Sequence, residues 1–221
     1  MQHSHLTGVL PFNYRVTKTP MKKLFFGAML VLIAAATTGV YYLTQKADIY
    51  YYKGHDFFVK AKYKAAIQPF LQSLAVDPKR SKTLTELGYS YLWAGDYPEA
   101  IQVFQKLVAL EPGAFRVKKS LASAYSWNKE YAKAEAIFRE VIRGDKNDRD
   151  AQKGLAEIYI WDNQFDKAKE ILTALLKSNA GDAQAKFLYG KALLYSGHTK
   201  EALKIFEELS GGSKPIARKT P

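Results

Sequence analysis

The sequence repeats itself with a period of 34 residues, and this period restricts the fold more than any other feature. Written in rows of 34 residues, the chain gives five rows that need no gap. The rows begin at Ala47, Ser81, Phe115, Arg149 and Ala183. Counted from the start of a row, column 20 is always alanine, and column 24 is phenylalanine in every row except the fourth. A fixed period of roughly 20 to 50 residues is typical of stacked repeat proteins.

Each row predicts two helices joined by a short turn. Apolar residues recur at spacings of three and four in both halves of a row, which is the period of one helix face. In the second row, Leu84, Leu87 and Tyr91 follow this spacing. Small residues occupy columns 8 and 20, where two helices can approach each other closely. Turn-forming sequences such as Ala94-Gly95-Asp96 separate the two halves, so each row is expected to fold as helix, turn and helix.

These columns resemble the tetratricopeptide repeat (TPR) family, whose period and signature they share. The second row carries the signature residues most completely: Leu87-Gly88, Tyr91, Tyr97, Ala100, Phe104 and Pro112. The resemblance implies an all-α fold, an α-solenoid of about five helix-turn-helix repeats. We therefore predict a TPR domain at residues 47–210, with repeats at 47–80, 81–114, 115–148, 149–182 and 183–216.

A long uncharged segment precedes the repeats. No charged residue occurs between Leu24 and Gln45, and this length of apolar chain can cross a hydrocarbon layer as a helix. Lys22 and Lys23 precede it, which predicts a cytoplasmic N-terminus. We predict a single-pass signal-anchor at residues 21–46 of a bacterial inner membrane, with the repeats on the periplasmic side. Cleavage after Ala36, which would release a soluble periplasmic protein, is the alternative.

Two short terminal segments flank these parts. Met21 opens a typical export signal, so residues 1–20 are interpreted as a short cytoplasmic tail or as the product of a start codon assigned too early. Residues 211–221 are predicted to form a flexible basic tail.

Composition narrows the classes of function. The chain has no cysteine, which excludes disulfides, cysteine-based zinc sites and thiol catalysis. Its net charge is +12, but basic and acidic residues are interspersed along the predicted helices, as in Lys133-Ala134-Glu135. This pattern is typical of a solvated face and argues against nucleic-acid binding. No phosphate loop, nucleophile motif or paired histidines occur, so we predict a non-catalytic protein without metal or cofactor.

All three tryptophans fall in column 13. This column contains Val59, Trp93, Trp127, Trp161 and Tyr195. In the TPR family the first helix of each repeat lines a concave groove with columns 2, 5, 9, 12 and 13, so the resemblance places these rings there. The basic residues that it places on the same face are Lys82, Arg116, Lys119, Lys153 and Lys191. Aromatic side chains with basic neighbours are typical of binding hot spots, so the aromatic residues from Trp93 to Tyr195 and these cations form the predicted partner-binding groove.

Three interpretations of column 13 stay open. The rings can pack between repeats, bind a protein or peptide partner, or stack on the sugar rings of a glycan. Repeats with tryptophan at this column are similar to those of envelope proteins for exopolysaccharide export. We therefore predict a protein-binding scaffold of the bacterial envelope, in exopolysaccharide export or another envelope assembly. A carbohydrate-binding module that uses the tryptophans is the alternative.

The end of the fifth row predicts a second surface. Stacked repeats usually end in a polar capping helix, and none follows in this sequence. Leu203, Phe206 and Leu209 would then keep part of their apolar face exposed, as a candidate docking face for a partner or a second copy. Fraying of a degenerate last repeat is the alternative, which Thr199 and Ser210 at normally apolar columns support.

Overall fold

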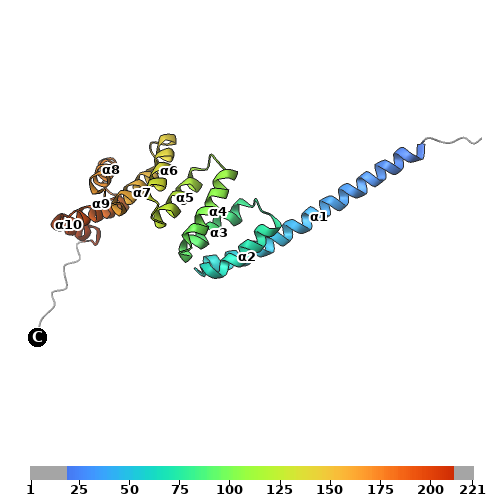
Figure 1. The fold of residues 1–221 in the computed structure, drawn as a ribbon, viewed down its shortest axis with the longest axis horizontal. Helices are drawn as coiled ribbons and strands as arrows, with labels where there is room; N and C mark the ends of the chain where they lie inside the picture. The colour runs from blue at the N-terminus through green and yellow to red at the C-terminus, as the bar shows by residue number, and fades with distance from the viewer. Residues whose placement is uncertain (1–18, 212–221) are drawn as a thin grey trace, which may run out of the picture. The chain divides into compact units, whose positions relative to one another are not determined.

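The computed structural model describes residues 19–211. The predicted tails at 1–20 and 211–221 fall outside this range apart from Thr19, Pro20 and Gly211. Ten α-helices and no strand occur in the described part of the chain, which confirms the all-α prediction (Figure 1). The helices are α1 Thr19–Val59, α2 Tyr63–Val76, α3 Ser81–Ala94, α4 Tyr97–Leu110, α5 Phe115–Trp127, α6 Tyr131–Gly144, α7 Arg149–Trp161, α8 Phe165–Ser178, α9 Ala183–Tyr195 and α10 Thr199–Leu209.

The chain divides into two units, residues 1–45 and residues 46–221, and α1 contributes to both. In the first unit, every side chain from Phe25 to Gln45 is exposed. From Phe25 onward, α1 is long and apolar enough to cross a membrane, by length and composition. This helix is compatible with either a membrane anchor or a signal helix.

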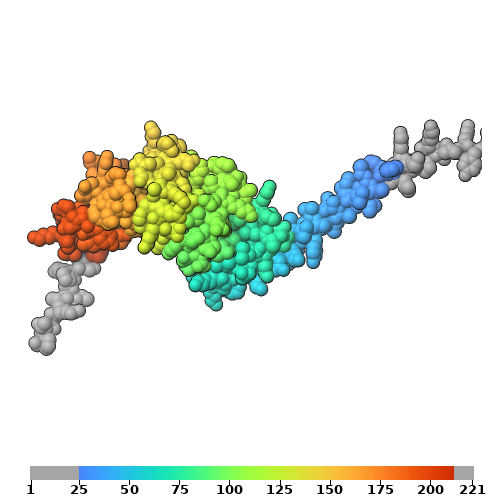
Figure 2. All heavy atoms as spheres, in the orientation of Figure 1, coloured from blue at the N-terminus to red at the C-terminus, as the bar shows by residue number. Residues whose placement is uncertain are grey.

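The second unit is the predicted solenoid of helix pairs. From α2 to α10, each helix packs on the helix that follows it, and the order along the sequence is the order in space (Figure 2). The buried side chains form a core that runs from one repeat to the next. The first helix α7 also contacts the first helices α5 and α9, so these three helices share one face of the stack.

Within a repeat, a phenylalanine of the second helix rests on a glycine of the first. A Cβ atom added at Gly88 would lie 2.7 Å from the ring of Phe104, and one at Gly54 would lie 2.6 Å from the ring of Phe70. The fifth repeat has the same contact between Gly190 and Phe206. The missing side chain at column 8 therefore sets how closely the two helices approach.

The third and fourth repeats have alanine instead of glycine at column 8, so the residue at column 24 packs differently in them. The ring of Phe138 lies against Gly154 of the next repeat, where an added Cβ would come within 2.5 Å. In the fourth repeat, the smaller Leu172 replaces phenylalanine opposite Ala156. The repeat columns did not predict the role of Gly154, because this contact crosses from one row to the next.

The turn between the two helices of each repeat passes through one residue with a left-handed backbone. This residue has a φ of 54° at Ala61, 62° at Lys129 and 60° at Asn163, and it is glycine in the other two repeats, Gly95 and Gly197. A left-handed residue other than glycine costs roughly 1–2 kcal/mol. Packing of the helix pairs therefore fixes the turn, even where the sequence does not favour it.

We expect Gly88→Ala to lower the free energy of unfolding by about 1–3 kcal/mol, since this is the usual cost of overpacking a filled core. Helix propensity alone would raise the stability by about 1 kcal/mol, so the sign of the change identifies the clash with Phe104. Urea denaturation measures it. Adding Phe104→Leu should restore most of the loss, because Ala156 and Leu172 form this pair naturally.

Gly113→Ala is the control for this substitution, because no atom lies within 4 Å of the added Cβ. A Gly88→Ala protein as stable as the parent would show that the phenylalanine contact does not set the helix spacing.

Candidate functional site

The first helices of the second to fifth repeats, α3, α5, α7 and α9, contribute to a hollow of about 520 Å³. Its lining comes mainly from columns 2, 5, 9, 12 and 13, the columns that the TPR resemblance assigns to the concave face. The predicted site residues in the lining are Trp93, Arg116, Lys119, Trp127 and Lys153. The remaining predicted groove residues, Lys82, Trp161, Lys191 and Tyr195, lie outside this lining. We call this hollow the groove.

The ring of Trp93 packs against three aromatic rings and is still half-exposed. Its centroid lies 4.9 Å from that of Tyr63, 5.5 Å from that of Phe58 and 5.2 Å from that of Tyr89. Nevertheless, 52% of Trp93 is exposed. This side chain therefore packs between repeats and also leaves about half of its surface exposed.

Trp127 makes similar ring contacts in the next repeat. Its ring lies 6.1 Å from that of Tyr97 in the preceding repeat and meets Trp161 edge-on at 5.6 Å. It is also 52% exposed, whereas Trp161 is half-buried. The ring of Tyr195 lies 6.5 Å from that of Phe165, so column 13 contacts the start of the preceding second helix along the stack.

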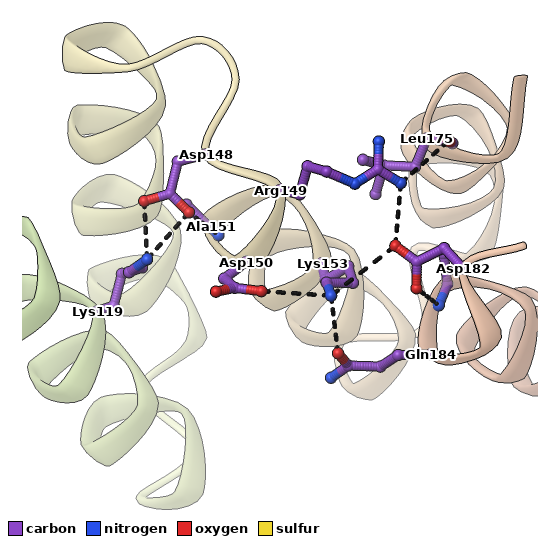
Figure 3. Close-up of polar contacts among 10 residues, drawn as sticks. Lys119, Asp148, Arg149, Asp150, Ala151, Lys153, Leu175, Asp182 and Gln184 are labelled. Carbon is purple, nitrogen blue, oxygen red and sulfur yellow. Dashed lines mark hydrogen bonds and ion pairs between the residues drawn. The ribbon is translucent and has the colours of Figure 1, made fainter. Parts of the chain in front are cut away.

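Two of the predicted groove lysines are engaged in ion pairs that connect neighbouring repeats (Figure 3). The ammonium of Lys119 donates to Asp148 Oδ2 at 2.8 Å, and Asp148 in turn accepts from the backbone N–H of Ala151 at 2.9 Å. Asp148 thus caps the N-terminus of α7 while it binds a lysine of α5. The pair links the first helices of successive repeats.

Asp182 plays the same role one repeat later. It caps α9 by accepting from the backbone N–H of Ala185 at 2.9 Å, and it accepts from Arg149 Nη2 at 2.9 Å. Lys153 lies 3.9 Å from Asp182 and donates to Gln184 Oε1 at 2.8 Å (Figure 3). The acidic residue at column 34 could have been recognised as a helix cap from its position just before a predicted helix.

The other predicted cations differ from one another. Lys82 pairs with Asp48 at 3.3 Å and lies 4.3 Å from the centroid of the Tyr51 ring. Lys191 lies 3.9 Å from a carboxylate oxygen of Glu157. Arg116 is exposed and has no carboxylate partner among residues 19–211. It is therefore the predicted groove cation that remains available to a ligand.

The carboxyl groups on this face have shifted pKa values. The backbone N–H of Ala185 and the guanidinium of Arg149 lower the pKa of Asp182. Burial opposes ionisation of Asp148, but the hydrogen bonds from Lys119 and Ala151 outweigh it and lower its pKa. Burial raises the pKa of Glu157 in the groove wall, and Lys191 acts in the opposite direction. In the described part of the chain, no group of His, Asp and Glu side chains is arranged to hold a metal ion.

Comparisons with known proteins agree with the helix pairs. Two family models, both described as tetratricopeptide repeat, match residues 51–115, 85–151 and 127–191. No curated protein matches the sequence. A crystal structure of the MamA protein is similar, with 25% sequence identity and a TM-score of 0.61, over 80% of this chain and 99% of that one.

Two further solved structures show the same fold at lower identity. A tetratricopeptide repeat protein from Parabacteroides merdae has a TM-score of 0.71 at 16% identity, over 76% of this chain and 66% of that one. YrrB, described as a TPR protein with an unusual peptide-binding site, has a TM-score of 0.56 at 16% identity, over 79% of this chain and 90% of that one.

We expect the Asp182 cap to make the stability depend on pH on the acid side. Its folded pKa lies below the value of about 3.9 for an unfolded aspartate, so its contribution is present above that pH. The contribution is lost as the pH falls through the folded pKa. Asp182→Asn should therefore be less stable by about 1–2 kcal/mol at pH 7 and show a shallower loss below about pH 4.

Urea denaturation between pH 3 and pH 7 measures both effects. Asparagine keeps an oxygen for the Ala185 amide, so the substitution isolates the charge. Asp56→Asn removes an exposed ion pair with Lys60 and serves as the control, with little expected change. Identical pH profiles for the parent and Asp182→Asn would refute the assigned role.

Proposed function

Because the chain belongs to the tetratricopeptide repeat family, we propose that it is a scaffold that binds a protein partner in the groove. Proteins of this family are generally non-catalytic and bind proteins or peptides through their repeats. The proposal rests on one observation: two half-exposed tryptophans, Trp93 and Trp127, line the same hollow as the exposed Arg116.

The tryptophan rings suit a binding surface because their positions are already fixed. Trp93 is held by Tyr63, Phe58 and Tyr89, so little side-chain entropy remains to be lost when a ligand covers its exposed part. Large rings that are rigid and half-exposed are typical hot-spot anchors. We infer that the partner places an apolar side chain against these rings.

Arg116 supports a charged contact beside the apolar one. A guanidinium binds a carboxylate through two parallel hydrogen bonds, which gives direction as well as affinity. Lys119 and Lys153 are less suited to this role, because each is already bound to groups of the neighbouring repeat. We therefore propose a partner segment that carries a carboxylate close to its apolar side chain.

We also propose that the scaffold works at the bacterial inner membrane. The apolar helix from Phe25 supports a single-pass anchor, and Lys22 and Lys23 before it support a cytoplasmic N-terminus with periplasmic repeats. An exopolysaccharide-export or other envelope assembly is the proposed setting. The second candidate function is glycan binding, which the open faces of Trp93 and Trp127 favour.

Charge reversal in the groove tests the partner proposal. We expect Arg116→Glu, and separately Trp93→Ala combined with Trp127→Ala, to reduce recovery of the partner from envelope extracts at least about tenfold, or roughly 1.4 kcal/mol. Quantitative mass spectrometry of pull-downs with the full chain measures the recovery. Lys106→Glu, at an exposed lysine of α4, is the matched control.

Equal recovery of the same proteins by the parent and by all groove variants would contradict the proposal. Titration of tryptophan fluorescence with soluble polysaccharides separates the two candidates. A saturable change that Trp93→Ala and Trp127→Ala abolish would favour glycan binding instead.

Fractionation tests the anchor. We expect the intact chain in the inner membrane, released by detergent and retained in high salt, because burial of an apolar helix does not depend on ionic strength. Protease added to spheroplasts should digest the repeats if they face the periplasm. Repeats found in the soluble periplasm, with a mature terminus near Thr37, would establish cleavage instead.

A further inference from the structure

The solenoid ends in an apolar surface, part of which is buried at the same columns of the inner repeats. At column 12, exposure is 9% for Leu92 and 2% for Ile160, but 40% for Leu194 in the last repeat. Leu172 and Leu175 of α8 are buried, whereas Phe206 and Leu209 at the same columns of α10 are half-buried. We define the terminal face as Phe187, Leu194, Leu203, Phe206 and Leu209, of which Leu203 is 56% exposed.

In the inner repeats, the first helix of the following repeat covers the columns of Phe206 and Leu209. Gly154 of α7 lies against the ring of Phe138, which occupies the column of Phe206. Val117 of α5 packs in one cluster with Leu107, which occupies the column of Leu209. The terminal face is therefore the continuation of an interface that the protein already forms between its own repeats.

The covering helix α9 has Tyr189 at column 7, and it packs on the repeat in which Leu172 replaces phenylalanine. The covering helices α3, α5 and α7 pack on repeats that have phenylalanine at column 24, as the last repeat has, and they share a simple pattern. Columns 3, 7 and 10 are buried in each of these three helices. Column 3 holds a small or β-branched residue, column 7 holds leucine, and column 10 holds another small or β-branched residue. In α5 these residues are Val117, Leu121 and Ala124, and in α7 they are Ala151, Leu155 and Ile158. The small first residue lets the two backbones approach, and the leucine fills the space between them.

We propose that the terminal face docks an amphipathic helix of another protein that carries this pattern. The face supplies the apolar surface, and the interfaces between the inner repeats supply the geometry. This site is separate from the groove and does not rest on the proposed function. The docked helix is expected to have a leucine at its centre and small or β-branched residues on either side.

A polar contact at the rim adds a further requirement. At column 25, Gln105 and Arg139 donate to the hydroxyl groups of Tyr125 and Tyr159 in the next repeat, at 2.7 Å and 2.6 Å. Glu207 occupies this column in α10 and is exposed. A carboxylate accepts hydrogen bonds and attracts cations. A docked helix with tyrosine or lysine four positions after its leucine is therefore favoured.

The first repeat of a second copy does not fit this face. Its residues at columns 3, 7 and 10 are Ile49, Lys53 and Asp56, all of them exposed. Docking it head to tail would bury a lysine and an aspartate where the inner repeats bury leucine and small residues. Burying a charge without a partner is strongly unfavourable. The sequence of residues 212–221 does not contain the pattern either.

A synthetic peptide tests the proposal. The probe is residues 148–162 of this chain, the α7 sequence, held helical by a hydrocarbon link on its solvent face and labelled for fluorescence anisotropy. The target is the full chain in phosphatidylcholine nanodiscs. We expect saturable binding that Leu194→Lys combined with Leu203→Lys weakens at least about tenfold. Both leucines are exposed, so the substitutions leave the repeats folded, which circular dichroism checks.

Matched controls locate the binding. Leu71→Lys places the same charge at an exposed leucine of α2 and should leave the affinity unchanged. Arg116→Glu should also leave it unchanged, which separates this site from the groove. A peptide with Leu155→Lys should lose binding, because the central leucine of the pattern is removed.

Three outcomes overturn the proposal. The first is a peptide that does not bind saturably, and the second is binding that Leu194→Lys with Leu203→Lys leaves intact. The third is self-association of the full chain, measured by sedimentation, that this double variant abolishes; it would assign the face to a second copy. Loss of partner recovery in groove variants alone bears only on the proposed function.

Discussion

The contact between a phenylalanine ring and a residue without a side chain determines the geometry of this protein. Phe104 on Gly88 fixes the distance between two helices, and the same contact recurs in the first and fifth repeats. Where alanine prevents it, the ring of Phe138 turns to Gly154 of the next repeat, so one repeat becomes coupled to its neighbour. These contacts set how closely the first helices, which line the groove, lie to the second helices.

Several charged residues of the groove are engaged in contacts that stabilise the stack of repeats. Asp148 and Asp182 cap the helices of one repeat while they bind basic side chains of the preceding one. A lysine held in this way has already lost its side-chain entropy and part of its hydration to the fold. Such a lysine offers a partner less than the exposed Arg116 does. The groups available to a ligand are therefore those that are not already bound within the stack, such as the guanidinium of Arg116.

Much of the architecture could be predicted from the sequence, because each repeat forms the same contacts and its columns record them. Column 20 alanines and column 24 phenylalanines were sufficient for the helix pairs. Contacts between rows were not visible in the columns. Lys153 donates to Gln184 of the next row, 31 residues away. For the tryptophans, packing and binding would each recur with the same period. Only the structure shows that Trp93 packs against the preceding repeat while half of the side chain stays exposed.

The first and the last repeat of the solenoid differ in the residues of their outer faces. A stack of repeats gains stability from each interface between neighbours, and each end lacks one interface. The first repeat replaces buried columns by Lys53 and Asp56, so its outer face is compatible with water. The last repeat keeps Leu194 and Leu203 exposed and so lacks the stability of one interface. A helix docked there would supply it, because a ligand that binds only the folded form stabilises that form. Docking would thus strengthen α9 and α10, and through the contacts of α9 with α7 it would reach the groove.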